Sequence, residues 1–233
     1  MYQRVKRYIN KVIDLRYGRV SYSQEGEDLL LDRIFEYAPT GFFVDVGAHH
    51  PKRFSNTYIF YKKGWRGINI DAMPDSMKLF RETRPHDINL ELGISKTKQT
   101  LTYYMFDEPA LNGFDKKLSE ERDNKTSYKI IDKKDVQTLP LGELLDTYIP
   151  PGVEISFMSI DVEGLDLEVL ESNDWVKYRP AVVLIEILHS TMEDIFESPV
   201  HMFLTEKNYG IYCKTPNTLL YKNKQLDRRE NTK

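Results

Sequence analysis

The sequence predicts an α/β layered fold built on a mostly parallel sheet. Short apolar runs rich in valine and isoleucine recur along the chain, at 42–46, 67–71, 155–161 and 181–187. Near-continuous apolar runs of this kind are typical of strands buried on both faces of a parallel sheet. Helix-like stretches separate the runs, and such an alternation of strand and helix indicates an α/β protein.

The remaining segments complete this arrangement. Two short runs near the C-terminus, 211–214 and 218–223, are interpreted as a closing antiparallel pair of strands. Helices are expected between and after the apolar runs, at 54–64, 74–84, 164–175 and 197–210.

Length and composition favour one soluble domain. The chain has 233 residues, of which 40% are hydrophobic and 30% charged, and its net charge of -3 argues against a nucleic-acid-binding protein. Cys213 is the only cysteine, which excludes a disulfide framework and a zinc–thiolate cluster and fits a reducing compartment. The first residues lack the apolar centre of a signal peptide, and no apolar run reaches the roughly 20 residues of a membrane span. A cytoplasmic location is therefore expected.

Three regions flank or interrupt the predicted domain at 21–222. Residues 1–20 carry six Lys/Arg and one Asp and predict a basic amphipathic helix, either docked on the domain or contacting a membrane surface or a partner. Residues 115–135 carry thirteen charges in 21 positions and are interpreted as a solvated insertion, with a flap over the substrate site as the alternative. Residues 223–233 form a charged tail.

The first stretch that suggests chemistry is "VDVGAHHP", at the end of the first strand. Gly47 permits a tight turn and the close approach of a ligand to the backbone. Because no G-x-G-x-x-G pattern follows, a dinucleotide site and a nicotinamide-dependent oxidoreductase are disfavoured. Asp45 offers an acceptor to an amino-bearing ligand, or caps the turn. His49 or His50 could take up a proton near neutral pH.

Acidic residues also end three later strands. Asp71 lies 24 residues after Gly47, where a carboxylate can accept both hydroxyls of a ribose. Asp161 and Glu163 follow the third strand, and they could hold a substrate, orient a base or bind a cation such as Mg²⁺, while Glu163 could also cap a helix. Glu186 ends the fourth strand, and His189 follows it near the same sheet edge.

Together these stretches resemble the FkbM-type methyltransferases, which use S-adenosylmethionine (SAM). The resemblance is carried by "YSQEGEDLLLDRIF", "FFVDVGAHHPKRFSNTYIFYKKGWRGINIDAMP", "LGIS", "ISFMSIDVEGLDLEVLES" and "PAVVLIEI", and it spans roughly residues 20 to 190. It implies a class I methyltransferase, Rossmann-like fold, with a seven-stranded, mostly parallel sheet and helices on both faces. The sequence departs from many class I enzymes, because His49, His50 and Pro51 stand where a glycine-rich loop is common.

The resemblance also implies site roles. Asp45 and Gly47 would line the methionine end of SAM, Asp71 the ribose, Ala72 and Met73 the adenine, and Gly93 and Ile94 would close over it. Further candidate SAM contacts are Gln24, Glu27, Ala48, His49 and Asn56. Asp161, His189 and His50 are the candidate catalytic residues. No metal is expected; the alternative is a divalent ion held by Asp161, Glu163, Glu186 and His189.

The function implied is SAM-dependent methylation, with a sugar hydroxyl in a glycan, nucleotide-sugar or secondary metabolite as the favoured acceptor. The alternatives are N-methylation of a small amine or amino-alcohol phosphate, and a SAM-binding or partner-binding domain without catalysis. Residues that choose the acceptor are expected in 105–135 and 189–200.

Overall fold

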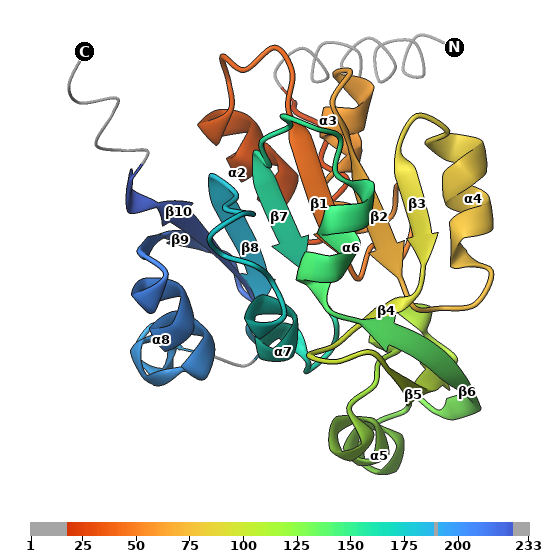
Figure 1. The fold of residues 1–233 in the computed structure, drawn as a ribbon. Coiled ribbons are helices and arrows are strands. Elements are labelled where there is room, and N and C mark those ends of the chain that lie inside the picture. The colour runs from red at the N-terminus through yellow and green to blue at the C-terminus, as the bar shows by residue number, and fades with distance from the viewer. Residues whose placement is uncertain (1–17, 189–190, 226–233) are drawn as a thin grey trace, which may run out of the picture.

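The computed structural model describes residues 18–188 and 191–225, which form a seven-stranded sheet with helices on both faces (Figure 1). This confirms the predicted α/β class. The sheet contains, in spatial order, β3 (Ile88–Glu91), β2 (Arg66–Asp71), β1 (Phe42–Val46), β7 (Phe157–Ile160), β8 (Val182–Glu186), β10 (Thr218–Asn223) and β9 (Tyr209–Lys214). The helices are α2 (Glu27–Ile34), α3 (Tyr58–Lys62), α4 (Ser76–Thr83), α5 (Lys116–Lys125), α6 (Leu141–Tyr148), α7 (Asp166–Glu171) and α8 (Pro199–Glu206).

Strand directions follow the prediction. The neighbours β3, β2, β1, β7 and β8 run parallel, whereas β10 is antiparallel to both β8 and β9. The chain leaves β1 toward β2 on one side and returns to β7 on the other, so the strand order reverses at β1. In open parallel sheets, ligands bind beyond the carboxyl ends of the strands at such a reversal.

Alternation of side chains along the strands builds two cores. On β1, Val44 and Val46 pack in the larger core with residues of α6, α7 and α8, whereas Phe43 packs in the second core with residues of α2 and α3. Helix α4 lies on the Phe43 side, because the guanidinium of Arg84 just after it lies 5.3 Å from the Phe43 ring centre. Because side-chain direction alternates along a strand, Asp45 faces the same side as Phe43.

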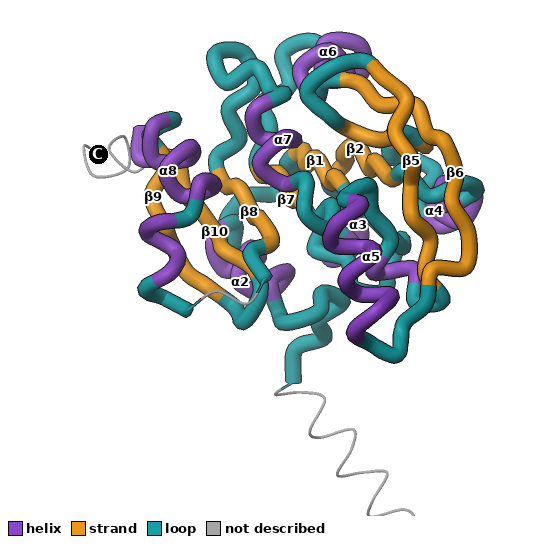
Figure 2. The backbone as a smooth tube through the Cα atoms, turned by 90° about the horizontal axis from the view of Figure 1, so that it is seen from below, coloured by secondary structure: helices purple, strands orange, loops and turns teal. Residues whose placement is uncertain are grey.

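A smaller sheet is inserted after β3 and extends beyond the carboxyl ends of the main strands (Figures 1 and 2). It contains, in order, β4 (Gly93–Ile94), β6 (Ile130–Leu139) and β5 (Gln99–Phe106), and the single-turn helix η1 (Pro109–Leu111) and α5 lie between β5 and β6. The predicted charged insertion 115–135 is thus α5, its N-cap and the start of β6. Most of this segment is exposed, as its charge suggests.

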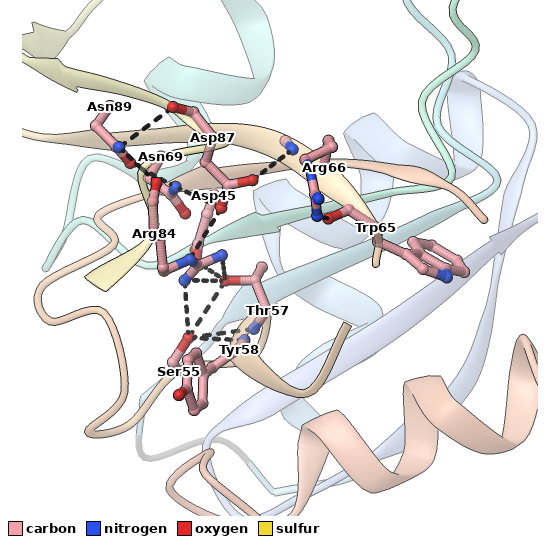
Figure 3. A network of polar contacts seen from close by, with 11 residues as sticks. Asp45, Ser55, Thr57, Tyr58, Trp65, Arg66, Asn69, Arg84, Asp87 and Asn89 are labelled. Atoms are coloured by element: carbon pink, nitrogen blue, oxygen red, sulfur yellow. Dashed lines mark hydrogen bonds and ion pairs between the residues drawn. The ribbon is translucent and has the colours of Figure 1, made fainter. Parts of the chain in front are cut away.

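A buried polar network occupies the Phe43 side of the sheet (Figure 3). The side chains of Arg84 and Asp87 are both fully buried and form an ion pair with a nitrogen–oxygen distance of 2.9 Å. Arg84 also donates to the Thr57 hydroxyl at 3.0 Å, and that hydroxyl donates to the Asp45 carboxylate at 2.7 Å. Asp45 is therefore tied into the packing between β1, α3 and α4.

Two predicted segments lie largely outside the described residues. These are the N-terminal helix at 1–20, described only from residue 18, and the tail at 223–233, described only to residue 225. Within 18–188 and 191–225, no helix is long and apolar enough to cross a membrane.

Candidate active site

A cavity of about 350 Å³ opens where β1, β2, β7 and β8 end, which is the edge that Figure 2 views. Its volume lies in the range typical of sites for small ligands and cofactors. The loops after these strands form one wall, and the smaller sheet with η1 and α5 forms the other. A side chamber of about 20 Å³ adjoins it, and the two share Gln24, Phe54, Asp161, Glu186 and Asn217.

The loop after β1 brings its backbone to the cavity through Gly47. This residue has φ 82°, and a Cβ placed on it would lie 1.7 Å from the carbonyl oxygen of Asp161. Any larger residue would push the ends of β1 and β7 apart. Glycine is required here both by conformation and by close packing, and it leaves the floor of the cavity as bare backbone.

Asp71 ties together the loops after β1 and β2. One oxygen of its carboxylate accepts the backbone N–H of His49 at 2.7 Å, and the other accepts that of Met73 at 2.8 Å. Burial raises the pKa of Asp71 to about 6, although both backbone hydrogen bonds oppose that shift. Asp71 lines the cavity. Its carboxylate is ionised at neutral pH and has lone pairs left for hydroxyl donors of a ligand.

Beyond Asp71 the cavity has an apolar slot. Met73, Leu92 and Ile94 line it from the main sheet and β4, and Phe114 lines it from the loop before α5. A Cβ on Gly93 would lie 2.6 Å from the Phe114 ring, so the ring packs directly on the Gly93 backbone. A flat apolar group such as a purine fits such a slot.

The opposite end of the cavity is acidic because of strand register. β7 and β8 are parallel with Ile160 opposite Ile185, so the next residues, Asp161 and Glu186, are neighbours on one face. One carboxylate oxygen from each of these, and one from Glu163, lie within 4.8 Å of one another. Three carboxyl groups thus face one space at the end of the sheet.

This crowding changes proton affinity. The pKa of Asp161 is raised well above its usual value, first by burial and then by the charges of Glu186 and Glu163. Burial likewise raises the pKa of Glu163 and of Glu186. The accessible surface of Asp161 is large enough to class the residue as exposed, but this residue lines the cavity. At neutral pH the cluster therefore retains protons that isolated carboxyl groups would lose.

Arg122 of α5 partly compensates this charge. Its guanidinium donates to Glu163 at 2.5 Å and to the carbonyl of Leu111 at 3.3 Å. Oxygen ligands at this spacing suit a hard divalent cation, but Arg122 already occupies one oxygen of Glu163. The three residues could hold a metal only if that ion pair were loosened or shared.

A second charged pair joins the two walls of the cavity. Arg53, after β1, and Glu108, before η1, form two parallel hydrogen bonds of 3.1 Å each. The ring nitrogen Nε2 of His49 lies 3.4 Å from Arg53. Burial, followed by the charge of Arg53, lowers the pKa of His49 to about 4. His49 is therefore neutral near pH 7.

Most of the residues predicted from sequence lie together. The cavity is lined by Gln24, Gly47, His49, Asp71, Ala72, Met73, Gly93, Ile94 and Asp161. Glu27 and Asn56 line the adjoining side chamber instead.

Four predicted residues are placed differently. Asp45 and Ala48 do not line either space, and Asp45 belongs to the buried network. His50 lies outside both as well, and its Nδ1 accepts the backbone N–H groups of Lys52 and Arg53. His189 is outside the described residues, and its catalytic role remains a prediction.

Several lining residues were not singled out from the sequence, although five of them lie in the segment 105–135 where acceptor-choosing residues were expected. They come from loops and from the inserted sheet, where no periodicity marks a ligand-facing side chain: Arg53, Phe54, Tyr103, Glu108, Asn112, Phe114, Arg122, Tyr128 and Asn217. Tyr103 and Phe114 pack together with ring centres 4.9 Å apart.

The residues present fit SAM. Asp71 can hold the ribose hydroxyls, the slot around Phe114 can hold the adenine, and the bare backbone at Gly47 allows close approach of the rest of the donor. All three features line one cavity. Asp161 then lies beyond Gly47, where an acceptor would enter.

The match to one family model agrees with a SAM site. The family model described as the methyltransferase FkbM domain matches residues 45–211, well over half of the chain. No curated protein is significantly similar to the chain. A solved TehB-like SAM-dependent methyltransferase from Corynebacterium glutamicum is 11% identical, with a TM-score of 0.41 over 96% of this chain and 100% of that chain. A precorrin-6y C5,15-methyltransferase from Geobacter metallireducens is 9% identical, with a TM-score of 0.41 over 83% of this chain and 85% of that chain.

Proposed function

The chain belongs to the FkbM methyltransferase family, and from that premise we propose that this SAM-dependent methyltransferase acts on a sugar hydroxyl of a glycan, nucleotide-sugar or secondary metabolite. The observation that carries the proposal is the row of carboxylates beside the donor cavity. A sugar hydroxyl is a weak acid, so its methylation requires a base placed at the acceptor oxygen.

SAM supplies an electrophilic methyl group on a sulfonium sulfur. The residues of the chain position this group: Asp71 fixes the ribose, and the backbone at Gly47 lets the donor lie against the end of β1. The alignment of acceptor, methyl carbon and sulfur accounts for much of the rate enhancement in such displacements.

Asp161 is the proposed proton acceptor. It follows β7 directly beside Gly47, and its side-chain partner among the described residues is the neighbouring carboxylate of Glu186, to which the protonated Asp161 donates. As the acceptor oxygen bonds to the methyl carbon and the carbon–sulfur bond breaks, the hydroxyl proton moves to the Asp161 carboxylate. Because its pKa is raised, Asp161 acts as a base only in its ionised form, which becomes populated as the pH rises, and that form is a stronger base than an ordinary aspartate. His189 remains a second candidate for this role.

The test is a methylation assay with a panel of acceptors. Purified protein is incubated with SAM and with methyl glycosides, nucleotide-sugars or ethanolamine phosphate, and release of S-adenosylhomocysteine is measured. We expect turnover with a sugar and an O-methyl signal in the NMR spectrum of the product. If only ethanolamine phosphate is methylated, the protein is an N-methyltransferase and the proposed sugar acceptor is wrong.

A cytoplasmic location belongs to the same proposal. It is supported by cysteine usage, because a sequence with Cys213 as its only cysteine fits a reducing compartment.

A further inference from the structure

Phe54 is the aromatic residue at the junction of the main cavity and the side chamber. It lines both spaces, and it keeps 40% of its accessible surface although large apolar side chains are normally buried. Asp161, the proposed base, lines the same two spaces. The ring is therefore exposed at the place where an acceptor would meet the donor.

The backbone at Phe54 is also unusual. Its φ is 58°, in the left-handed region that bulky residues rarely adopt. Such conformations cluster at functional sites, where surrounding contacts hold them. Here the next residue, Ser55, is held by a 3.0 Å hydrogen bond from its N–H to the carbonyl of Tyr22. A turn alone would be made better by Asn or Gly, so the ring itself needs an explanation.

The neighbours of Phe54 fix the ring. The guanidinium of Arg53 lies 4.2 Å from its centre, and the His49 ring lies nearly parallel at 6.3 Å. Arg53 is in turn held by the paired hydrogen bonds to Glu108. The ring is thus a supported surface rather than a freely rotating side chain.

Polar groups suited to hydroxyls lie around it. Gln24 lines both spaces, and its side-chain amide has no hydrogen-bond partner among the described residues. Asn217 also lines both, and its amide nitrogen donates to Glu25 at 2.8 Å, which fixes the orientation of its side chain. An aromatic surface with amide and carboxylate groups at its margin matches a sugar, whose C–H face is apolar and whose edge is polar.

A cationic acceptor fits less well. Arg53 is stacked on Phe54, and Arg122 lines the main cavity, so a second cation at the ring would meet like charge. The nearby carboxylates of Glu25 and Glu27 are occupied: Glu25 accepts from Thr215 and Asn217, and Glu27 accepts from Thr215 and Thr218. These carboxylates tie the N-terminal segment to the β9–β10 hairpin. The carboxyl groups that line both spaces are Asp161 and Glu186, which hold protons at neutral pH and therefore attract an ammonium group weakly.

We propose that Phe54 is the platform on which the sugar ring of the acceptor stacks, with Gln24 and Asn217 at the edge of that ring. The inference rests on the proposed function and assigns to it a specificity-determining residue. Stacking on Phe54 places the ring between the donor and Asp161, so that one hydroxyl faces the methyl group.

The experiment compares Phe54→Asn and Phe54→Trp with the wild-type full chain. Asn tolerates the left-handed backbone and removes the ring, whereas Trp retains an aromatic surface. Tyr37→Asn is the matched control, because Tyr37 is 91% exposed and does not line either space. Binding of S-adenosylhomocysteine is measured by calorimetry, and methyl glycosides of common hexoses are tested by saturation-transfer NMR and as methyl acceptors.

We expect Phe54→Asn to raise the KM for the active glycoside about tenfold, in line with the strength of aromatic contacts. In Phe54→Asn, the affinity for S-adenosylhomocysteine and the thermal stability should change little. The KM of Phe54→Trp and of Tyr37→Asn should stay close to that of the wild type. The proposal is overturned if the Asn variant keeps the wild-type KM, or if the wild-type protein binds S-adenosylhomocysteine but neither binds nor methylates any of the glycosides. Failure of the folded wild-type protein to bind S-adenosylhomocysteine would remove the proposed function itself, and this inference with it.

Discussion

Two groups of carboxylates occupy the same face of the sheet, but their surroundings differ. Asp45 and Asp87 lie in the buried network, where the Thr57 hydroxyl and the Arg84 guanidinium donate to them (Figure 3). Asp161 and Glu186 lie at the cavity, and none of the cations in the described chain pairs directly with either. Burial raises the pKa of Asp45 and of Asp161, yet only Asp45 has donors that offset the shift.

The difference separates structure from function. A buried carboxylate with donors contributes to a unique packing, and removing its partner leaves an uncompensated charge. A carboxylate crowded by like charges destabilises the fold, and such groups are retained where chemistry needs them. Substitutions in the two groups should therefore have opposite effects on stability and on activity.

The largest effect is expected in the buried network. Arg84→Met leaves Asp87 without its partner and should lower the free energy of unfolding by about 3–5 kcal/mol. Urea unfolding measures this loss. The matched control is Arg33→Met, whose side chain is 72% exposed and pairs with Glu36, and which should cost less than about 0.5 kcal/mol. Equal losses in the two variants would mean that the network does not stabilise the fold.

The next effect is expected at the cavity, where a substitution should lower turnover rather than the free energy of unfolding. Asp161→Asn should lower kcat about a hundredfold, as loss of a general base does. Its stability should change little, because the raised pKa keeps the Asp161 carboxyl largely protonated at neutral pH and asparagine is likewise uncharged. Steady-state kinetics and thermal unfolding on the same preparation test both parts. Undiminished kcat would assign Asp161 to the structural group.

A pH effect is expected at Asp71, whose pKa is about 6. The ionised carboxylate is the form that accepts ribose hydroxyls, so protonation competes with SAM. SAM affinity should be constant above about pH 7 and fall as the pH drops through about 6. Calorimetry across this range measures it. Asp71→Asn should bind more weakly and show no such fall; a fall of the same size in this variant would assign the titration to another group.

The smallest effect on turnover is expected from adding or removing a divalent metal ion. Because Arg122 already pairs with Glu163, addition of Mg²⁺ or of a chelator should change turnover by less than about twofold. The assay is run with and without each reagent. Loss of activity on chelation, restored by Mg²⁺, would instead make the three carboxylates metal ligands.

The sequence predicted the parts of the fold that are buried on both faces. The strands β1, β2, β7 and β8 appeared as apolar runs because helices cover both sides of the sheet. It did not predict β6, because six of its ten residues are exposed and several are charged, so the segment looked like a solvated loop. Exposed strands carry little periodic signal.

The site was predicted where residues follow strand ends, and less well elsewhere. Asp71 and Asp161 end or follow a strand and reach the cavity, whereas Asp45 precedes the last residue of β1 and points into the helix layer. Asp45 lies one position before the end of its strand, and this is why it points into the helix layer instead of the cavity. Phe54, Glu108 and Asn217 come from loops whose course depends on tertiary contacts, and local sequence does not specify that course.

The central claim, that this cavity binds SAM through Asp71, is tested most directly by calorimetric titration of the wild-type protein and of Asp71→Ala with SAM. The account predicts one site of micromolar affinity in the wild type and a loss of about tenfold or more in the variant, with both proteins folded. No binding to the folded wild type, or equal affinity in the two proteins, would contradict it.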